Sequence, residues 1–202
     1  MKKKQLEIYL QQVPDFPERN PGLEQYITPA EIAADMLYIA YQFNDIQDKK
    51  IIDLGCGTGI FSAGAALIGA KEIIGIDKDL NALNVAQEFA SQNNLKINYI
   101  ESDISKVNIK TDTVIMNPPF GAQKSNIHAD RRFIEKAFEI SKTIYTLHLT
   151  KTIPFIETMV QSLEGDIDFM KNYELRIKHG YKFHSKEQKF FNVTLLKINI
   201  KK

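Results

Sequence analysis

Only one cysteine, Cys56, occurs among the 202 residues, and this scarcity excludes several classes of protein. One thiol forms no internal disulfide and no metal site built from several thiolates. The sequence has four histidines, and no two of them have the i, i+4 spacing of a helical metal site. No metal is therefore predicted. Cys56 lies between two glycines and is expected to be packed rather than nucleophilic.

The sequence also lacks long apolar runs and an excess of either charge. No run approaches the ~20 apolar residues that cross a bilayer, and the basic start of the chain is not followed by the apolar segment of a secretory signal. We therefore expect a cytoplasmic protein without membrane contact. The 26 basic and 25 acidic residues give a net charge of +1. Binding to long nucleic acid would need a local basic patch.

The pattern of what is present predicts one α/β domain over residues 1–202, with an N-terminal helix and arm at 1–27 and the core at 28–202. Short apolar, β-branched runs alternate with amphipathic segments, which is typical of a mostly parallel sheet with helices on both faces. The last two runs alternate apolar and polar residues and predict an antiparallel C-terminal hairpin. The seven expected strands are 50–54, 71–76, 97–100, 112–116, 143–148, 167–177 and 190–200.

The segment Asn117-Pro118-Pro119-Phe120 directly follows one of these strands. Two prolines cannot continue the hydrogen-bond ladder, so Asn117 should lie at a carboxyl strand end, where open parallel sheets bind ligands. A rigid turn that holds a carboxamide, a carbonyl and an aromatic ring suits a planar amide or an aromatic amine. Asn117 and the Pro118 carbonyl would each accept one hydrogen of an adenine amine, and Phe120 would stack on the base. The alternative is a plain proline-rich turn with Phe120 in the core.

A glycine-rich turn, Gly55-Cys56-Gly57-Thr58-Gly59, lies between an expected strand and a helix that begins at Ile60. Glycines let backbone amides approach a ligand without Cβ clashes. The dinucleotide fingerprint has glycines at its first, third and sixth positions, whereas here they occupy the first, third and fifth. This spacing disfavours a pyrophosphate site and leaves a nicotinamide oxidoreductase as a distant alternative.

Acidic residues follow the next two expected strands. Asp77 comes about 20 positions after the glycine turn and is placed to bind both hydroxyls of a ribose; a cap at the start of the next helix is the alternative. Asp103 would accept the amino hydrogens of a cofactor adenine while the amide of Ile104 donates to the ring. The sequence therefore predicts a nucleoside-binding edge beside Asn117.

The arm before the first long helix contains Gln25-Tyr26-Ile27-Thr28-Pro29-Ala30-Glu31. Thr28, with proline next and glutamate three positions later, predicts a capping box. Gln25 and Tyr26 are not needed for a helix start, so they indicate either a polar loop with a packed tyrosine or a segment that closes over a ligand.

Together these motifs resemble the class I S-adenosylmethionine-dependent methyltransferases that act on an adenine amine. The arm, the Asn-Pro-Pro-Phe segment and Tyr181-Lys182-Phe183-His184 make the chain similar, over nearly its whole length, to the archaeal and eukaryotic family of small-subunit ribosomal RNA adenine-N6 methyltransferases. The resemblance implies a Rossmann-like methyltransferase fold, S-adenosylmethionine as cofactor, RNA as substrate and a small zinc-binding activator protein as partner.

Residue roles follow from the same resemblance. It implies Asn117, Pro118, Pro119 and Phe120 as the catalytic motif. The cofactor contacts that the resemblance and the motifs together indicate are Gln25, Thr28, Asp53, Gly55, Gly57, Thr58, Gly59, Ile60, Asp77, Asp103, Ile104 and Asn117.

Basic and aromatic residues in two segments are candidates for contact with RNA. They are Lys124, Arg131, Arg132, Lys182, Phe183, His184 and Lys186. A solvated helix face and an exposed hairpin tip explain the same residues without RNA. Two further functions remain open: methylation of a protein glutamine amide, and a cofactor-binding RNA chaperone or assembly factor without catalysis.

Overall fold

The computed structural model describes residues 1–20, 23–120, 129–178 and 188–201. Its α-helices are α1 (Lys3–Leu10), α2 (Ala30–Gln42), α3 (Ile60–Leu67), α4 (Leu80–Gln92), α5 (Ala129–Ile140) and α6 (Ile153–Ser162). Its strands are β1 (Lys50–Leu54), β2 (Glu72–Asp77), β3 (Asn98–Glu101), β4 (Thr113–Met116), β5 (Thr143–Leu149), β6 (Gly165–Lys178) and β7 (Gln188–Ile200). The short 3-10 helices η2 (Ile104–Lys106) and η4 (Thr150–Thr152) follow β3 and β5.

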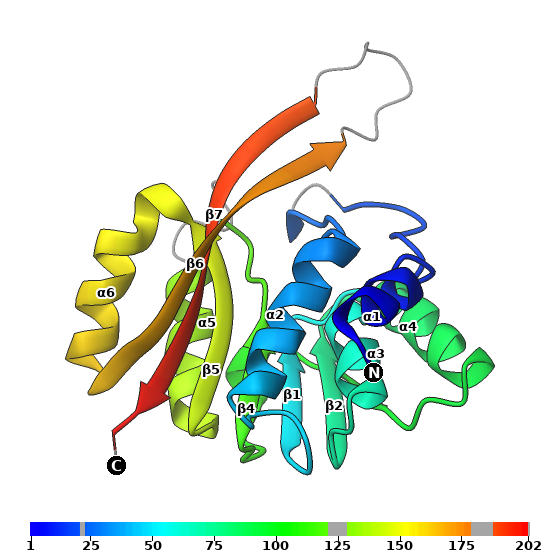
Figure 1. Cartoon of the computed structure of the whole chain (residues 1–202), viewed down its shortest axis with the longest axis horizontal. Coiled ribbons are helices and arrows are strands. Elements are labelled where there is room, and N and C mark those ends of the chain that lie inside the picture. Colours follow the sequence, from blue (N-terminus) through cyan, green and yellow to red (C-terminus); the bar gives the residue numbers. More distant parts are fainter. Residues whose placement is uncertain (21–22, 121–128, 179–187, 202) are drawn as a thin grey trace.

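All seven strands form one sheet in the order β3-β2-β1-β4-β5-β7-β6. β1 to β5 pair in parallel, and β7 is antiparallel to both β5 and β6. The hairpin of β6 and β7 extends well beyond the parallel strands (Figure 1). The predicted fold, a mostly parallel seven-stranded sheet with a C-terminal antiparallel hairpin, is confirmed.

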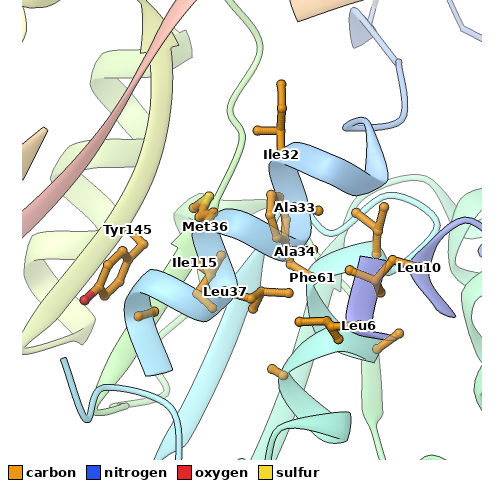
Figure 2. Packing of buried hydrophobic residues seen from close by; sticks show 14 of the residues in the cluster. Leu6, Leu10, Ile32, Ala33, Ala34, Met36, Leu37, Phe61, Ile115 and Tyr145 are labelled. Atoms are coloured by element: carbon orange, nitrogen blue, oxygen red, sulfur yellow. The ribbon is translucent and has the colours of Figure 1, made fainter. Parts of the chain in front are cut away.

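Apolar side chains cover both faces of the sheet and make two cores. One core joins the sheet to α1, α2 and α3, with Leu6, Met36 and Phe61 buried in it. Figure 2 shows this core, in which Ile115 of β4 and Tyr145 of β5 lie beside α2. The second core packs α5 and α6 against the opposite face. Helices therefore cover both faces, as the near-continuous apolar runs of parallel strands require.

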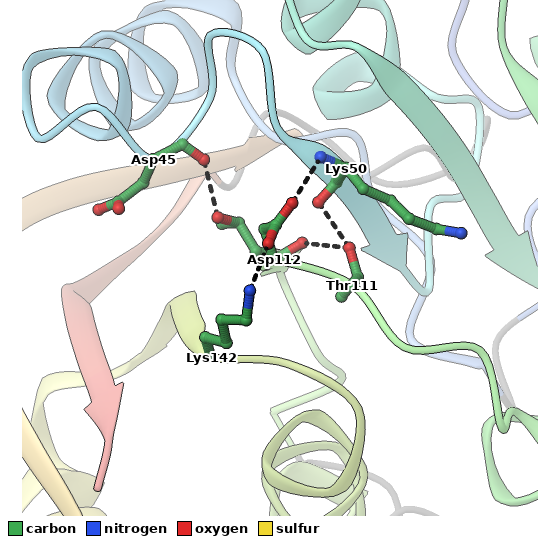
Figure 3. Close-up of polar contacts among 6 residues, drawn as sticks. Asp45, Lys50, Thr111, Asp112 and Lys142 are labelled. Atoms are coloured by element: carbon green, nitrogen blue, oxygen red, sulfur yellow. Dashed lines mark hydrogen bonds and ion pairs between the residues drawn. The ribbon is translucent and has the colours of Figure 1, made fainter. Parts of the chain in front are cut away.

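Polar bonds tie together the loops at the amino ends of β1, β4 and β5 (Figure 3). The backbone amide of Lys50 donates to Asp112, the Thr111 hydroxyl donates to the Lys50 carbonyl at 2.6 Å, and Lys142 forms an ion pair with Asp112 at 2.8 Å. The Thr113 hydroxyl donates to the Asp45 carbonyl at 2.7 Å. This edge is thus occupied by structural bonds, which leaves the carboxyl ends of the strands for a ligand.

The start of α2 differs from its prediction. The helix begins at Ala30 with Pro29 at the N-cap position, and no side chain caps it. The predicted capping box with Thr28 at the cap is therefore wrong. The Thr28 hydroxyl instead accepts a hydrogen bond from the Asn117 side chain at 2.9 Å.

Two findings concern membranes and metals. Among the described residues, no helix is long and apolar enough to cross a bilayer. Within those same residues, no group of three or more histidine, cysteine, aspartate or glutamate side chains is placed to hold a metal ion.

Candidate active site

A cleft lies where β1, β2, β3 and β4 end. Residues that directly follow or end these strands line it, as do residues of the N-terminal arm and of α5. Seven predicted cofactor contacts are among the lining residues: Gln25, Gly55, Gly57, Asp77, Asp103, Ile104 and Asn117. The predicted nucleoside-binding edge is therefore a hollowed surface that brings these residues together.

The glycine turn forms one wall of the cleft. Gly55 has φ 75° and Gly57 has φ 53°, values that other residues rarely adopt. A Cβ atom on Gly57 would lie 2.7 Å from the ring of Phe16, and one on Gly55 would lie 2.9 Å from the ring of Phe133. Because the rings lie this close to the turn, a side chain at either glycine would clash with them, and the glycine turn lines the cleft together with Phe16 and Phe133.

Asp77 stands at the end of β2 and organises the turn. Its Oδ2 accepts from the Gly57 amide at 2.8 Å, and its Oδ1 accepts from the Asp79 amide at 3.0 Å. Burial raises the pKa of the Asp77 carboxyl above its ordinary value. Since each carboxylate oxygen accepts more than one hydrogen bond, both oxygens keep capacity for a ligand hydroxyl.

Asp103 caps the short helix η2 while it lines the cleft. Its Oδ1 accepts from the hydroxyl of Ser105 at 2.7 Å and from the Ser105 amide at 2.9 Å. These two bonds, that of the hydroxyl first, lower the pKa of the Asp103 carboxyl. The side chain is thus an anion fixed at the end of β3, next to Ile104, in the position expected for an adenine-binding pair.

Two hydroxyl groups of the arm hold the carboxamide of Asn117. The hydroxyl of Tyr26 donates to Asn117 Oδ1 at 3.0 Å, and Asn117 Nδ2 donates to Thr28 Oγ1 at 2.9 Å. Pro118 behind it is buried, and Pro119 lines the cleft. Asn117 therefore sits at the carboxyl end of β4, as predicted, with its side chain fixed by the arm.

The ring of Phe120, which was predicted to stack on the substrate base, contacts the ring of Tyr26. It lies 5.5 Å from the ring of Tyr26, measured between centroids, with an angle of 35° between the planes. Phe120 is half-buried, packs against the core and does not line the cleft. The alternative prediction placed Phe120 in the core, and the structure shows the ring partly buried against the core.

Several predicted cofactor contacts lie beneath the cleft rather than along it: Thr28, Asp53, Thr58, Gly59 and Ile60. Asp53 shows why. Its Oδ2 accepts from the amide and hydroxyl of Ser62, so the carboxyl supports the first turn of α3 from below. Burial raises its pKa to about 7. The side chain of Asp53 therefore supports the glycine turn from the core.

The candidate RNA contacts divide into described and undescribed residues. Arg132 lines the cleft, whereas Arg131 forms an ion pair with Glu135 at 2.9 Å. The remaining candidates lie outside the described residues: Lys124, Lys182, Phe183, His184 and Lys186.

Sequence reasoning missed several cleft residues. Phe16, Leu23, Lys78 and Phe133 line the cleft without belonging to a predicted motif. Apolar residues in a proline-rich arm were the available signal for Phe16 and Leu23. Tyr26 was singled out as a residue without a role in helix formation, and it contacts Asn117.

The sheet order, the glycine turn and the acidic residues at the strand ends together define a class I methyltransferase. The chain belongs to the Methyltransferase small domain family, whose model matches residues 31–147. S-adenosylmethionine is its cofactor, and the glycine turn beside the Asp77 carboxyl, whose two oxygens can each accept a further hydrogen bond, fits a nucleoside that carries an amino acid.

Two relatives and one solved structure illustrate the similarity. The rRNA N(6)-adenosine-methyltransferase METTL5 of Danio rerio is 38% identical, over 93% of each chain. The crystal structure of PH1948 from Pyrococcus horikoshii, a candidate RNA methyltransferase, has a TM-score of 0.91 at 36% identity and covers 99% of this chain and 98% of its own. A candidate protein N5-glutamine methyltransferase of Methanocaldococcus jannaschii is 36% identical over only 45% of this chain and 46% of its own.

Proposed function

We propose that this protein transfers a methyl group from S-adenosylmethionine to the N6 amine of an adenine in RNA, and that the RNA is ribosomal RNA of the small subunit. The observation that carries the proposal is the carboxamide of Asn117, which is held by Tyr26 and Thr28 and lines the same cleft as the glycine turn. Similarity to an rRNA adenosine methyltransferase along 93% of the chain supports the choice of substrate.

The chemistry needs little beyond alignment. S-adenosylmethionine supplies a methyl group that its positively charged sulfur already activates for displacement. Asn117 Oδ1 and the Pro118 carbonyl would each accept one hydrogen of the adenine amine, which favours the pyramidal nitrogen of the transition state over the planar ground state. The nitrogen thereby gains a lone pair directed at the methyl group. Water can take the released proton afterwards, so the site needs no general base.

The proposed cofactor contacts divide the cleft into three parts. Asp77 would bind the ribose hydroxyls, and Asp103 with the Ile104 amide would bind the adenine of the cofactor. The turn at Gly55 and Gly57 would face the methionine portion. This division follows the order of strands in the sheet, since β2 and β3 lie on the far side of β1 from Asn117.

The target base must leave its stack to reach Asn117. Extruding a paired base costs a few kcal/mol, and less if the base lies in a loop. Arg132, at the mouth of the cleft, could bind a phosphate of the extruded nucleotide. A cytoplasmic location, where ribosomes work, is part of this proposal.

The first test is Asn117→Ala. We expect methyl incorporation into ribosomal RNA to fall by about 10²–10³-fold, since two transition-state contacts depend on this residue and its backbone position. S-adenosylmethionine should bind within a few-fold of the parent value in isothermal titration. The exposed Asn84 of α4 provides a matched control, because Asn84→Ala removes the same group at a residue that does not line the cleft. Equal activity of the Asn117 variant and the parent would remove this residue from the reaction.

A protein glutamine amide is the second candidate substrate, and one observation favours it. The amide and the adenine amine present the same planar nitrogen, and the similarity to a candidate N5-glutamine methyltransferase extends over 45% of the chain. Incubation with purified ribosomal RNA and, separately, with a release factor distinguishes the two. If only the release factor is methylated, the substrate is a protein glutamine and not RNA. Binding of RNA with no methyl transfer to either would favour an assembly factor.

A small zinc-binding activator protein is part of the proposal on resemblance alone. β3 is an edge strand of the sheet, with Asn98 and Glu101 exposed, and an unpaired edge can accept a strand from another chain. Assays should therefore be run on the protein alone and after co-purification from cells. A mass-spectrometric map of methyladenosine in ribosomal RNA, with and without the gene, would identify the target nucleotide.

A further inference from the structure

Tyr26 reaches from the N-terminal arm to the proposed catalytic side chain. Its hydroxyl donates to Asn117 Oδ1 at 3.0 Å, across 91 positions of sequence. Tyr26 lines the cleft and is half-buried. No motif explains a tyrosine here, since it plays no part in the start of α2. Its contacts indicate a role at the site rather than in the helix.

The carboxamide of Asn117 needs partners to hold one plane. Rotation about the last torsion of an asparagine is broad, so an unsupported carboxamide samples many angles. Tyr26 holds the oxygen and Thr28 holds the nitrogen, at 3.0 and 2.9 Å. Two bonds from opposite ends fix the plane. One lone pair of Oδ1 remains for a substrate hydrogen, because an amide oxygen accepts two.

The arm is itself anchored on both sides of Tyr26. Gln25 donates to Asp79 at the start of α4, and Thr28 accepts from Asn117 at the end of β4. Phe120 packs against the Tyr26 ring with 5.5 Å between centroids. Burial raises the pKa of the Tyr26 hydroxyl far above its ordinary value, so the group remains a donor over any assay range. Tyr26 is thus a rigid donor with a fixed direction.

We propose that Tyr26 is a positioning residue, whose hydroxyl holds the Asn117 carboxamide in the plane that presents Oδ1 to the substrate amine. This inference rests on the proposed function, because it assumes that Asn117 accepts from that amine. The opposite role, in which Tyr26 blocks the position of the target base through the same contacts with Asn117 and Phe120, is the outcome that the test separates from it. The two roles predict opposite changes in rate when the hydroxyl is removed.

The test is Tyr26→Phe, which removes the hydroxyl and keeps the ring on Phe120. We expect kcat for ribosomal RNA to fall roughly 10-fold, the usual effect of one lost hydrogen bond at a reacting group. The Kd for S-adenosylmethionine should stay within about two-fold, since one hydroxyl that binds Asn117 is removed and the glycine turn is untouched. Tyr41→Phe is the matched control, because Tyr41 is exposed on α2. An unchanged kcat, a higher kcat, or equal losses in kcat and cofactor affinity would each overturn the positioning role.

A second readout does not depend on turnover. The side-chain amide of Asn117 gives a pair of ¹⁵N-correlated proton signals, identified by their loss in Asn117→Ala. In the parent one of these two protons donates to Thr28 and should be shifted by that hydrogen bond. In Tyr26→Phe the signals should shift and broaden, whereas Tyr41→Phe should leave them in place. Unmoved signals would refute the contact on which the inference depends.

The two proposals fail in different ways. A parent protein that methylates no RNA refutes the proposed function, while the amide signals still decide whether Tyr26 holds Asn117. If the parent is active and Tyr26→Phe changes neither the rate nor the amide signals, the proposed function stands and the inference about Tyr26 is overturned.

Discussion

Asp53 provides the sharpest physical prediction, because it is a buried carboxyl with one unmatched oxygen. The residue is 1% exposed, and only its Oδ2 has partners, the amide and hydroxyl of Ser62. Among the described residues, Oδ1 has no hydrogen-bond partner. Burial, with a smaller contribution from the charge of Asp77, raises the pKa of the Asp53 carboxyl from 3.8 to about 7.

The direction of the pH effect follows from this shift. Between pH 4 and 7 the folded protein holds a proton that the unfolded chain has lost, so raising the pH favours unfolding. A carboxyl whose pKa is raised this far loses roughly 2–3 kcal/mol of stability between pH 5 and pH 8. Rearrangement and water entry reduce the cost, and we expect at least about 1 kcal/mol.

The perturbation is Asp53→Asn, which keeps the shape and cannot ionise. Urea unfolding of parent and variant at pH 5 and pH 8 gives four free energies of unfolding, and their double difference isolates Asp53 from all other titrating groups. The parent should lose more stability than the variant on going to pH 8. A double difference below about 0.5 kcal/mol would refute the reasoning, because a carboxyl that titrates alike in both states contributes no pH dependence.

Two further outcomes test the cleft and the scaffold. Asp77→Ala should weaken S-adenosylmethionine about 10–100-fold in isothermal titration, since hydrogen bonds to a charged group are worth ~1.5–3 kcal/mol; an unchanged Kd would exclude Asp77 from the ribose site. Asp35→Ala should destabilise the fold by about 1 kcal/mol in urea at pH 7. Burial opposes ionisation of Asp35, but bonds from Lys171, Lys3 and Tyr173 outweigh it and lower its pKa to about 2, so the effect should fade as the pH drops from 4 towards 2. An effect of equal size at pH 7 and pH 3 would contradict this role.

The fold could be predicted closely because its determinants are local. Apolar runs of the parallel strands mark their own boundaries, so that the expected strand 71–76 and the observed β2, Glu72–Asp77, differ by one residue. The two prolines after Asn117 end β4 at Met116 by removing donors from the ladder. The positions of Gly57, Asp77 and Asn117 followed from the strand ends, because parallel strands present their carboxyl ends at one edge.

The contacts between the arm and the site could not be predicted, because they join residues with no shared periodicity. Phe16 meets Gly57, and Tyr26 meets Asn117, over sequence distances that leave no pattern. Such pairs depend on how the arm crosses the sheet edge. That path is set by packing of the whole domain.

Thr28 shows how a local rule loses to a distant partner. A threonine before Pro-Ala-Glu favours a helix cap worth about 1 kcal/mol. The same hydroxyl can instead satisfy a half-buried carboxamide, and leaving such a group unpaired costs about 1–3 kcal/mol. The helix also begins one residue later than a Thr28 cap requires, with Pro29 at the N-cap position. The bond to Asn117 therefore wins, and α2 begins without a side-chain cap. A polar side chain beside a ligand site is predictable only when the need of its distant partner is known.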